Sequence, residues 1–190
     1  DGARMITLTW NGENEIGSGN VTGRGLSGFG KEAVRELERE GIIIDVSHLN
    51  DRGFNDLLKT ARRPFAASHS NARAVCGHKR NLTDEQIQEM IRRRCLIGLN
   101  FYNAFLREDG LPAAPDDLWR HVEHFLSLGA EDCLALGSDA DGADLPPWLD
   151  NPGKLAGLYR YFLDRGLSTV QAQGILWRNA LRFFQENLVK

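Results

Sequence analysis

The sequence predicts an α/β fold built on a parallel β-sheet. A segment of helical length follows each of five short β-prone segments, and such alternation indicates parallel strands joined by right-handed crossovers. The IIIDV run at residues 42–46 is almost continuously β-branched, which is typical of a strand covered on both faces. Periodicity alone leaves open whether the sheet is doubly wound or closed into a barrel. The five expected strands cover residues 5–10, 42–46, 64–68, 95–100 and 133–137.

Helix signals separate these strands. Apolar residues at helical spacing predict a helix over residues 31–40, and Thr83 with Gln86 forms a capping box that begins another. The glycine-rich residues 11–30 predict a long loop. After the last strand only helices are expected. The remaining predicted helices run from a cap at Asn50 or Asp51 to about residue 60, and over residues 116–128, 154–165, 168–176 and 178–188.

Length and composition narrow the classes of protein. A chain of 190 residues corresponds to one domain or at most two small ones. Its 23 Lys and Arg against 26 Asp and Glu leave a formal charge of -3, which argues against a nucleic-acid partner. No apolar run approaches the ~18 residues of a membrane span, and residues 1–10 lack the features of a signal peptide. The 3 scattered cysteines indicate reduced thiols, so we expect a cytoplasmic location.

Polar groups follow the predicted strands, at the end where ligands bind in α/β sheets and barrels. His48 follows the second strand and His69 the third, and parallel neighbours about 4.8 Å apart allow both imidazoles to reach one ion. Imidazoles suit zinc and similar divalent metals, although two ordinary loop histidines remain the alternative. Asp139 and Asp141 follow the fifth strand. Either carboxylate could bind metal or transfer a proton, and an Asx turn that caps the loop is the alternative.

Three further patterns each admit two interpretations. Arg80 is either a solvated surface residue or a bidentate clamp for a substrate carboxylate. His121 and His124 lie three apart on a predicted helix, but no third ligand is evident, so helix packing is the better interpretation. The glycine patterns at residues 17–19 and 23–25 lack the GK[ST] of a phosphate loop and predict an ordinary loop.

Seven motifs run in register along the chain, from the first strand to the last helix. They are LTWNG at 8–12, GLS at 25–27, DVSH at 45–48, SHSNAR at 68–73, RN at 80–81, GSDADG at 137–142 and NALR at 179–182. In order and spacing they resemble the membrane (renal) dipeptidase family of zinc metallopeptidases over essentially the whole chain. The resemblance implies a (β/α)8 TIM barrel of the metal-dependent hydrolase type, with two zinc ions at the C-terminal ends of the strands.

The resemblance also implies roles for individual residues. His48 and His69 match the histidine ligands of the second zinc, and Arg80 matches the arginine that holds the C-terminal carboxylate of a dipeptide. Asp139 matches the catalytic aspartate beside the metal-bridging water, which shuttles a proton. The implied activity is hydrolysis of dipeptides, often with a D-residue on the C-terminal side, and a homodimer is suggested. The other expected substrate contacts are Trp10, Asn100 and Tyr102.

The chain departs from the family pattern at two places. Trp10 stands where many relatives have a substrate-contacting histidine, and an indole donates one hydrogen bond and does not titrate. The His-x-Asp pair of the first zinc and the glutamate that bridges both ions are absent. The first three of the eight barrel strands are absent as well.

We therefore expect residues 1–190 to form a single, partial barrel domain with about five C-terminal β/α units. The missing N-terminal half would come from another polypeptide or from sequence before Asp1. With only two histidine ligands, we expect one zinc or weak occupancy, and little activity of the chain by itself. The alternatives are a related barrel amidohydrolase that acts on another small amide or lactam, and an inactive binding module.

Overall fold

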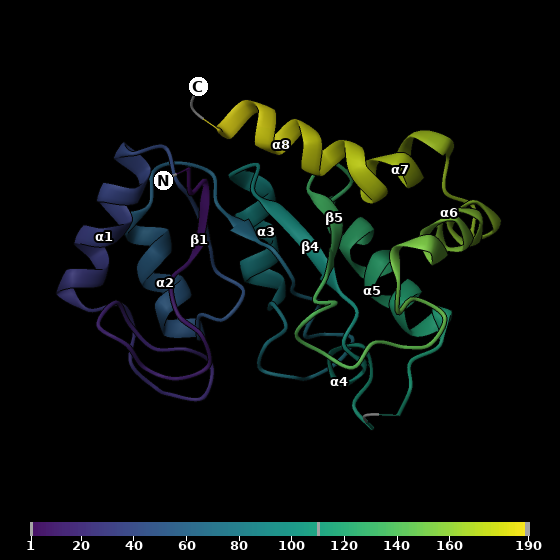
Figure 1. Ribbon diagram of the computed structural model, residues 1–190, viewed down its shortest axis with the longest axis horizontal. Coiled ribbons are helices and arrows are strands. Elements are labelled where there is room, and N and C mark those ends of the chain that lie inside the picture. The colour runs from purple at the N-terminus through teal and green to yellow at the C-terminus, as the bar shows by residue number, and fades with distance from the viewer. Residues whose placement is uncertain (1, 110, 189–190) are drawn as a thin grey trace.

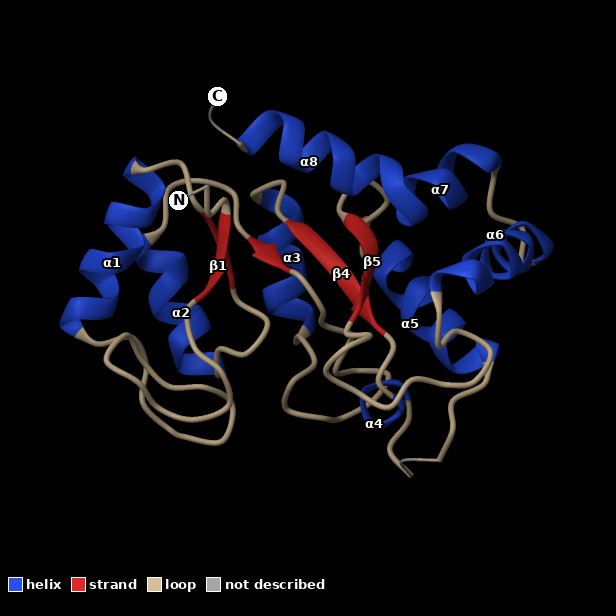
Figure 2. Ribbon diagram, in the orientation of Figure 1, coloured by secondary structure: helices blue, strands red, loops and turns tan. Residues whose placement is uncertain are grey.

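Five parallel strands form one sheet in the computed structural model, which describes residues 2–109 and 111–188 (Figures 1 and 2). Each strand pairs with the next one along the chain, in the order β1-β2-β3-β4-β5. A doubly wound sheet reverses its strand order at a switch point, whereas this order runs in one direction, as in the wall of a barrel. The predicted α/β class is confirmed. The strands are β1 (Met5–Thr7), β2 (Ile43–Asp45), β3 (Ala66–Ala67), β4 (Leu96–Asn100) and β5 (Leu134–Ser138).

Three of the helices between the strands begin at polar caps. Ser27, Asn50 and Thr83 each accept a hydrogen bond from a backbone N–H of the first turn, and Thr83 forms the predicted capping box with Gln86. The Ser27 cap starts its helix one turn earlier than the apolar pattern predicts. The capped helices are α1 (Gly28–Arg39), α2 (Asp51–Thr60) and α3 (Asp84–Arg92), and the other two are α5 (Pro115–Ser127) and the short α4 (Asn103–Leu106), which was not predicted.

Only helices follow β5, as predicted. They are the 3-10 turn η1 (Pro152–Lys154), α6 (Leu155–Asp164), α7 (Thr169–Gln173), the π-helical turn η2 (Gly174–Arg178) and α8 (Asn179–Asn187). The predicted break at residue 177 is wrong, because the chain continues through a π turn instead of ending a helix. Helix α8 crosses the N-terminal ends of β4 and β5 (Figure 1), where Asn179 Nδ2 donates to the carbonyls of Glu131 and Leu134. Within the described residues, no helix is both long and apolar enough to cross a bilayer.

The two faces of the sheet have different partners because strand side chains alternate. One face packs against the helices and contributes to the main core, as Ile44, Ala67 and Ile97 do. The opposite face, here called the inner face, forms a smaller cluster with Phe183 of α8. The inner-face members of that cluster are Ile43, Ala66, Leu96 and Ala135. The same alternation brings polar residues to the C-terminal end of the inner face, among them Asp45, Ser68 and Asn100.

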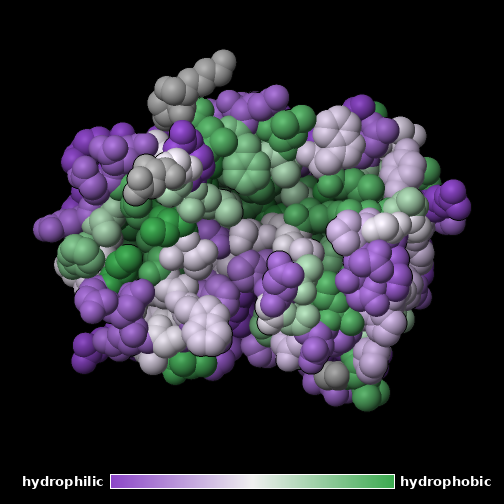
Figure 3. All heavy atoms as spheres, in the orientation of Figure 1, coloured by the Kyte–Doolittle hydropathy of each residue, from purple (hydrophilic) through white to green (hydrophobic). Residues whose placement is uncertain are grey.

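Both edges of the sheet carry apolar surface. Met5 and Ile6 of β1 are 38% and 40% exposed. Beside β5, the lining of a cavity of about 220 Å³ includes five leucines, among them Leu136 and Leu145. Figure 3 views the inner face of the sheet, between these two edges. Apolar side chains gather there around a hollow next to the C-terminal helices. Open sheet edges of this kind are normally covered by further strands, helices or loops.

Candidate functional site

The site lies at the C-terminal ends of the strands, where two glycines let the chain after β3 approach the inner face. A Cβ atom on Gly98 would lie 2.1 Å from the carbonyl oxygen of Ser68, and one on Gly137 would lie 2.0 Å from it. Such contacts exclude any side chain at either position. The two glycines therefore allow Ser68 and His69 to lie over the inner face.

The two histidines predicted to share an ion are brought together. The Nε2 atoms of His48 and His69 are 3.0 Å apart, and the ring centroids are 5.0 Å apart. Burial and the nearby Arg80 guanidinium lower the pKa of His48 to about 4. Burial also lowers the pKa of His69, against the opposing charges of Asp45 and Asp139. Both rings are therefore neutral near pH 7, the form in which imidazole binds a metal.

Each histidine is oriented through its other ring nitrogen. His48 Nδ1 is 3.0 Å from Asn11 Oδ1, and His69 Nδ1 is 2.7 Å from Ser68 Oγ. Ser68 in turn donates to Asp45, a buried carboxylate that is 1% exposed. Contacts of this kind fix the rotation and tautomer of a ligating imidazole.

Sequence reasoning assigned no role to Asn11, Asp45 or Ser68. A signal was present for Asp45, because it is the one charged residue in the apolar run 42–46. A carboxylate in a buried strand must be hydrogen-bonded, so its neighbours were candidates for a polar network. No comparable signal marks Asn11, since its contact with His48 depends on the path of the loop.

Arg80 is buried without a partner for one end of its guanidinium group. The residue is 6% exposed, its Nη2 atom has no hydrogen-bond partner within the described residues, and its Cζ lies 5.4 Å from the Phe105 ring centroid. Burial lowers its pKa to about 10, while Asp139 and Asp45 oppose that shift, so the group stays charged near neutral pH. A buried, charged and incompletely paired guanidinium is unfavourable unless an anion completes its bonding.

Asp139 lies in a strained turn at the end of β5. Ser138 and Asp139 have φ angles of 54° and 72°, in the left-handed region that costs non-glycine residues free energy. The Asp139 carboxylate accepts a hydrogen bond from Asn100 Nδ2 through Oδ2, at 3.0 Å. This contact orients one oxygen of the carboxylate by a side chain from the neighbouring strand.

One cavity of about 570 Å³ joins most of the predicted site residues. Its lining includes His48, Arg80, Asp139, Asp141, Trp10 and Tyr102. Trp10 is 73% exposed at the rim, and its ring centroid is 6.5 Å from that of His48. Asn100 is fully buried and does not line this cavity; its amide contacts Asp139, His69 and Tyr102 instead. A direct contact of Asn100 with substrate stays a prediction.

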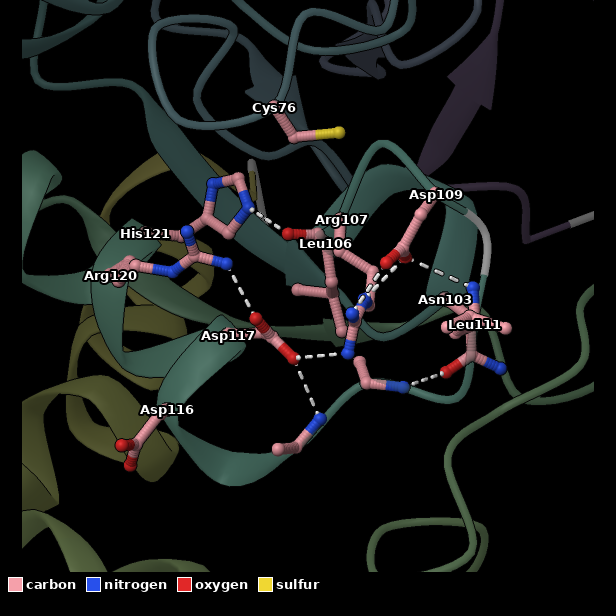
Figure 4. Close-up of polar contacts among 12 residues, drawn as sticks. Cys76, Asn103, Leu106, Arg107, Asp109, Leu111, Asp116, Asp117, Arg120 and His121 are labelled. Carbon is pink, nitrogen blue, oxygen red and sulfur yellow. Dashed lines mark hydrogen bonds and ion pairs between the residues drawn. The ribbon is translucent and has the colours of Figure 1, made fainter.

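The other patterns have structural roles. His121 is fully buried and accepts a hydrogen bond from the backbone N–H of Ala72. Figure 4 shows its other contact, with the carbonyl of Leu106. His124 pairs with Asp84, so the two histidines of α5 have separate partners, consistent with helix packing. The glycine patterns lie in the loop before α1, and the three cysteines are free and buried.

The donors present fit part of a metal site. Within residues 2–109 and 111–188, no cluster of three or more His, Cys, Asp or Glu side chains is arranged to hold a metal. The converging Nε2 atoms of His48 and His69 are suitable zinc ligands, but a catalytic zinc site needs three protein ligands. The pair therefore fits zinc chemistry and supplies only some of the ligands.

Similar solved structures share this fold. The chain superposes with a TM-score of 0.92 and 32% identity on a metallopeptidase from Rhodobacter sphaeroides solved with a phosphinate mimic of the dipeptide L-Ala-D-Ala, covering 97% of this chain and 56% of that one. A second match is dipeptidase AC, a metallopeptidase of family M19, with a TM-score of 0.93 and 32% identity, over 97% of this chain and 58% of that one. The five strands therefore correspond to part of a dipeptidase barrel.

Sequence comparisons lead to the same family as the solved structures. An uncharacterized protein from the pqqA 5' region of Klebsiella pneumoniae is 38% identical over 200 residues, 95% of this chain and 71% of that protein. An uncharacterized dipeptidase of Schizosaccharomyces pombe is 31% identical over 194 residues, so this chain spans 47% of its length. The family model described as membrane dipeptidase (peptidase family M19) matches residues 1–190. The chain therefore belongs to the membrane dipeptidase family M19.

Proposed function

We propose that this chain forms the metal-binding and substrate-binding part of a zinc dipeptidase that hydrolyses the amide bond of dipeptides. The observation that carries the proposal is the buried, incompletely paired guanidinium of Arg80 in the cavity that His48 and Asp139 also line. The cavity is lined by a cation, the imidazole of His48 and a carboxylate, and His69 lies directly behind His48 with the two Nε2 atoms 3.0 Å apart. These are the groups needed to hold and cleave a small anionic amide. The phosphinate dipeptide mimic in the R. sphaeroides relative supports this substrate class.

His48 and His69 would hold the metal through their Nε2 atoms. When bound, zinc lowers the pKa of a water molecule and polarises the scissile carbonyl. Since these histidines are only two of the ligands required, further ligands would come from strands outside residues 1–190. The chain would then be a single partial barrel domain, with one zinc or weak occupancy by itself. Its coverage of 56% and 58% of the two solved relatives supports that arrangement.

Arg80 would bind the C-terminal carboxylate of the substrate. The unsatisfied Nη2 atom offers a charge-assisted hydrogen bond, which is stronger than a neutral one. A peptide with a third residue would carry its carboxylate beyond this position and leave the guanidinium unpaired. Such a penalty favours dipeptides over longer peptides.

Asp139 would transfer the proton. Asn100 occupies its Oδ2 atom, which leaves Oδ1 to accept a proton from the attacking water and to return it to the leaving amine. Trp10 and Tyr102 would contact the substrate at the rim of the cavity. Trp10 can donate one hydrogen bond from its indole N–H but cannot exchange a proton.

The experiment compares binding of L-Ala-D-Ala with binding of its C-terminal amide, measured by calorimetry with zinc present. We expect the free carboxylate to bind about tenfold to a hundredfold more tightly, since a hydrogen bond to a charged group contributes about 1.5–3 kcal/mol. Arg80→Ala should remove that difference by weakening only the free dipeptide. Turnover of L-Ala-D-Ala is followed in parallel.

Arg165→Ala is the control, because Arg165 pairs with Asp116 away from the cavity. It should leave both affinities unchanged. Equal affinity of the unmodified chain for the acid and the amide would contradict the carboxylate clamp. Equal losses for both ligands in Arg80→Ala would instead favour an amidohydrolase with another substrate.

A further inference from the structure

We propose that Ser68 and Asp45 are positioning residues that hold His69 in its Nδ1–H tautomer, so that the Nε2 lone pair faces His48. The inference rests on the proposed function, in which both histidines bind metal. A chain of hydrogen bonds runs from the buried Asp45 carboxylate through Ser68 Oγ to the ring, and both links are 2.7 Å long.

The first link is Asp45, whose carboxylate is surrounded by donors. Its Oδ1 atom lies 2.8 Å from the Ser68 backbone nitrogen and 2.7 Å from Ser47 Oγ. Its Oδ2 atom lies 2.8 Å from Thr7 Oγ1 and 2.7 Å from Ser68 Oγ. An ionised carboxylate only accepts hydrogen bonds, so all of these neighbours donate to it. Asp45 thereby stays buried without an unpaired oxygen.

The second link is the Ser68 hydroxyl, which has one proton and three polar neighbours. They are Asp45 Oδ2 at 2.7 Å, His69 Nδ1 at 2.7 Å and Ser47 Oγ at 3.0 Å. If the proton pointed to the ring or to Ser47, two oxygen lone pairs would face each other across the 2.7 Å to Asp45. The hydroxyl therefore donates to Asp45, and its oxygen accepts from His69 Nδ1–H.

The third link is the ring of His69. A neutral imidazole carries one proton, so a proton on Nδ1 leaves Nε2 with a free lone pair. His48 is set in the same way by a different partner. Asn20 Nδ2 donates to Asn11 Oδ1 at 2.8 Å, which identifies that atom as the amide oxygen. An amide oxygen only accepts, so the proton of the contact with His48 lies on Nδ1 of the ring.

The consequence is that two lone pairs converge. The Nε2 atoms of His48 and His69 are 3.0 Å apart with no proton between them. That juxtaposition is unfavourable by itself and becomes favourable when a cation binds both nitrogens. Asp45 and Ser68 would thus contribute to metal affinity without touching the metal.

The experiment records the ring ¹⁵N chemical shifts of His69 in the zinc-free chain at about pH 8, above the ordinary histidine pKa. We expect the Nδ1–H tautomer in the unmodified chain and a shift toward Nε2–H in Ser68→Ala. Zinc alone is then titrated by calorimetry. Ser68→Ala should lower zinc affinity about tenfold or more, the usual effect of losing a partner of a ligating histidine. Ser68→Thr keeps the hydroxyl and should restore both readouts.

Thr7→Val is the matched control. It removes a different hydroxyl from the same Asp45 Oδ2 atom, at 2.8 Å instead of 2.7 Å, and Thr7 does not contact a histidine ring. A purely structural role for the network predicts equal effects of the two substitutions, and that result would overturn the proposal. An Nε2–H tautomer in the unmodified chain would also overturn it, and this measurement needs no variant to fold. Expected ring shifts without zinc binding would count against the proposed function, while the positioning of His69 would stand.

Discussion

Asn100 Nδ2 donates a hydrogen bond to Asp139 Oδ2 across 3.0 Å, and so joins the ends of β4 and β5. The bond occurs where the register of the two strands shifts, since Asn100 aligns with Ser138 after an irregularity at Leu99. The Asn100 carbonyl oxygen Oδ1 also accepts from the backbone N–H of Tyr102, at 2.7 Å. One buried side chain therefore fixes a carboxylate and a turn together.

Replacement of that side chain tests its contribution to stability. Asn100→Ala leaves the Tyr102 N–H and one Asp139 oxygen without their partners, which should lower the free energy of unfolding by about 2–4 kcal/mol. Urea denaturation of the purified chain measures the change. Asn103→Ala is the control, because the Asn103 amide is also hydrogen-bonded, to Asp144 and Ala113, but is only half-buried. Water can replace the partners of Asn103, so an equal loss in both variants would argue against the buried role of Asn100.

The same substitution should have opposite effects at two glycines. Gly137→Ala places a methyl group 2.0 Å from the Ser68 carbonyl oxygen. The other atoms nearest to that methyl group are also backbone atoms, which cannot shift without distorting the sheet. Gly157 lies inside α6 with no atom within 4 Å of the added methyl group. We expect Gly137→Ala to lower the thermal midpoint and Gly157→Ala to raise it, the latter by about 0.5–1 kcal/mol of unfolding free energy. Circular dichroism melting checks both signs, and stabilisation by Gly137→Ala would refute the close approach at Ser68.

Most of the fold could be predicted because local signals agreed with each other. The capping box of Thr83 and Gln86 begins α3 as expected, and the β-branched run at 42–46 contains β2. Boundaries were less predictable. Only Ala66 and Ala67 of the expected strand at 64–68 pair with neighbours, because strand pairing depends on the adjacent segments and not on local composition. The π turn before α8 likewise reflects packing that no residue preference reveals.

The candidate site was predictable to the extent that strand ends converge. That rule brought His48 and His69 together and located Asp139 at the end of the last strand. The rule could not reveal that Arg80 is buried without a full set of partners, because burial depends on segments distant in sequence. Nor could it distinguish residues that line the cavity from those behind the lining, such as Asn100, which is fully buried and donates to Asp139.

A capping substitution tests one of the local signals. Thr83→Ala removes the hydroxyl that accepts from the Gln86 backbone N–H, at 3.3 Å, and so leaves an N-terminal donor of α3 unpaired. The expected loss is about 1 kcal/mol of unfolding free energy, the usual effect of removing a threonine cap. Urea denaturation measures it. Thr169→Ala, at the exposed first residue of α7, has no cap to lose and should change stability by less than half as much.

His121 should make stability depend on pH. It is fully buried, and burial, aided by Arg120 and His124, lowers its pKa to about 4 although the Leu106 carbonyl and Asp117 oppose the shift. Between about pH 4 and the ordinary histidine pKa of 6.5, the unfolded chain binds a proton that the folded chain does not. The contribution of neutral His121 to the free energy of unfolding is therefore fully present above pH 6.5. It falls as the pH drops toward 4, by an amount on the order of 3 kcal/mol.

His121→Gln should flatten that pH dependence. Glutamine does not titrate, so the free energy of unfolding of the variant should change less between pH 7 and pH 4 than that of the unmodified chain. The variant will be less stable at neutral pH, because its amide cannot reproduce both contacts of the ring, with the Ala72 N–H and the Leu106 carbonyl. The comparison therefore rests on the slope with pH and not on the absolute stability. The same slope in His121→Gln as in the unmodified chain would assign the acid sensitivity to other groups.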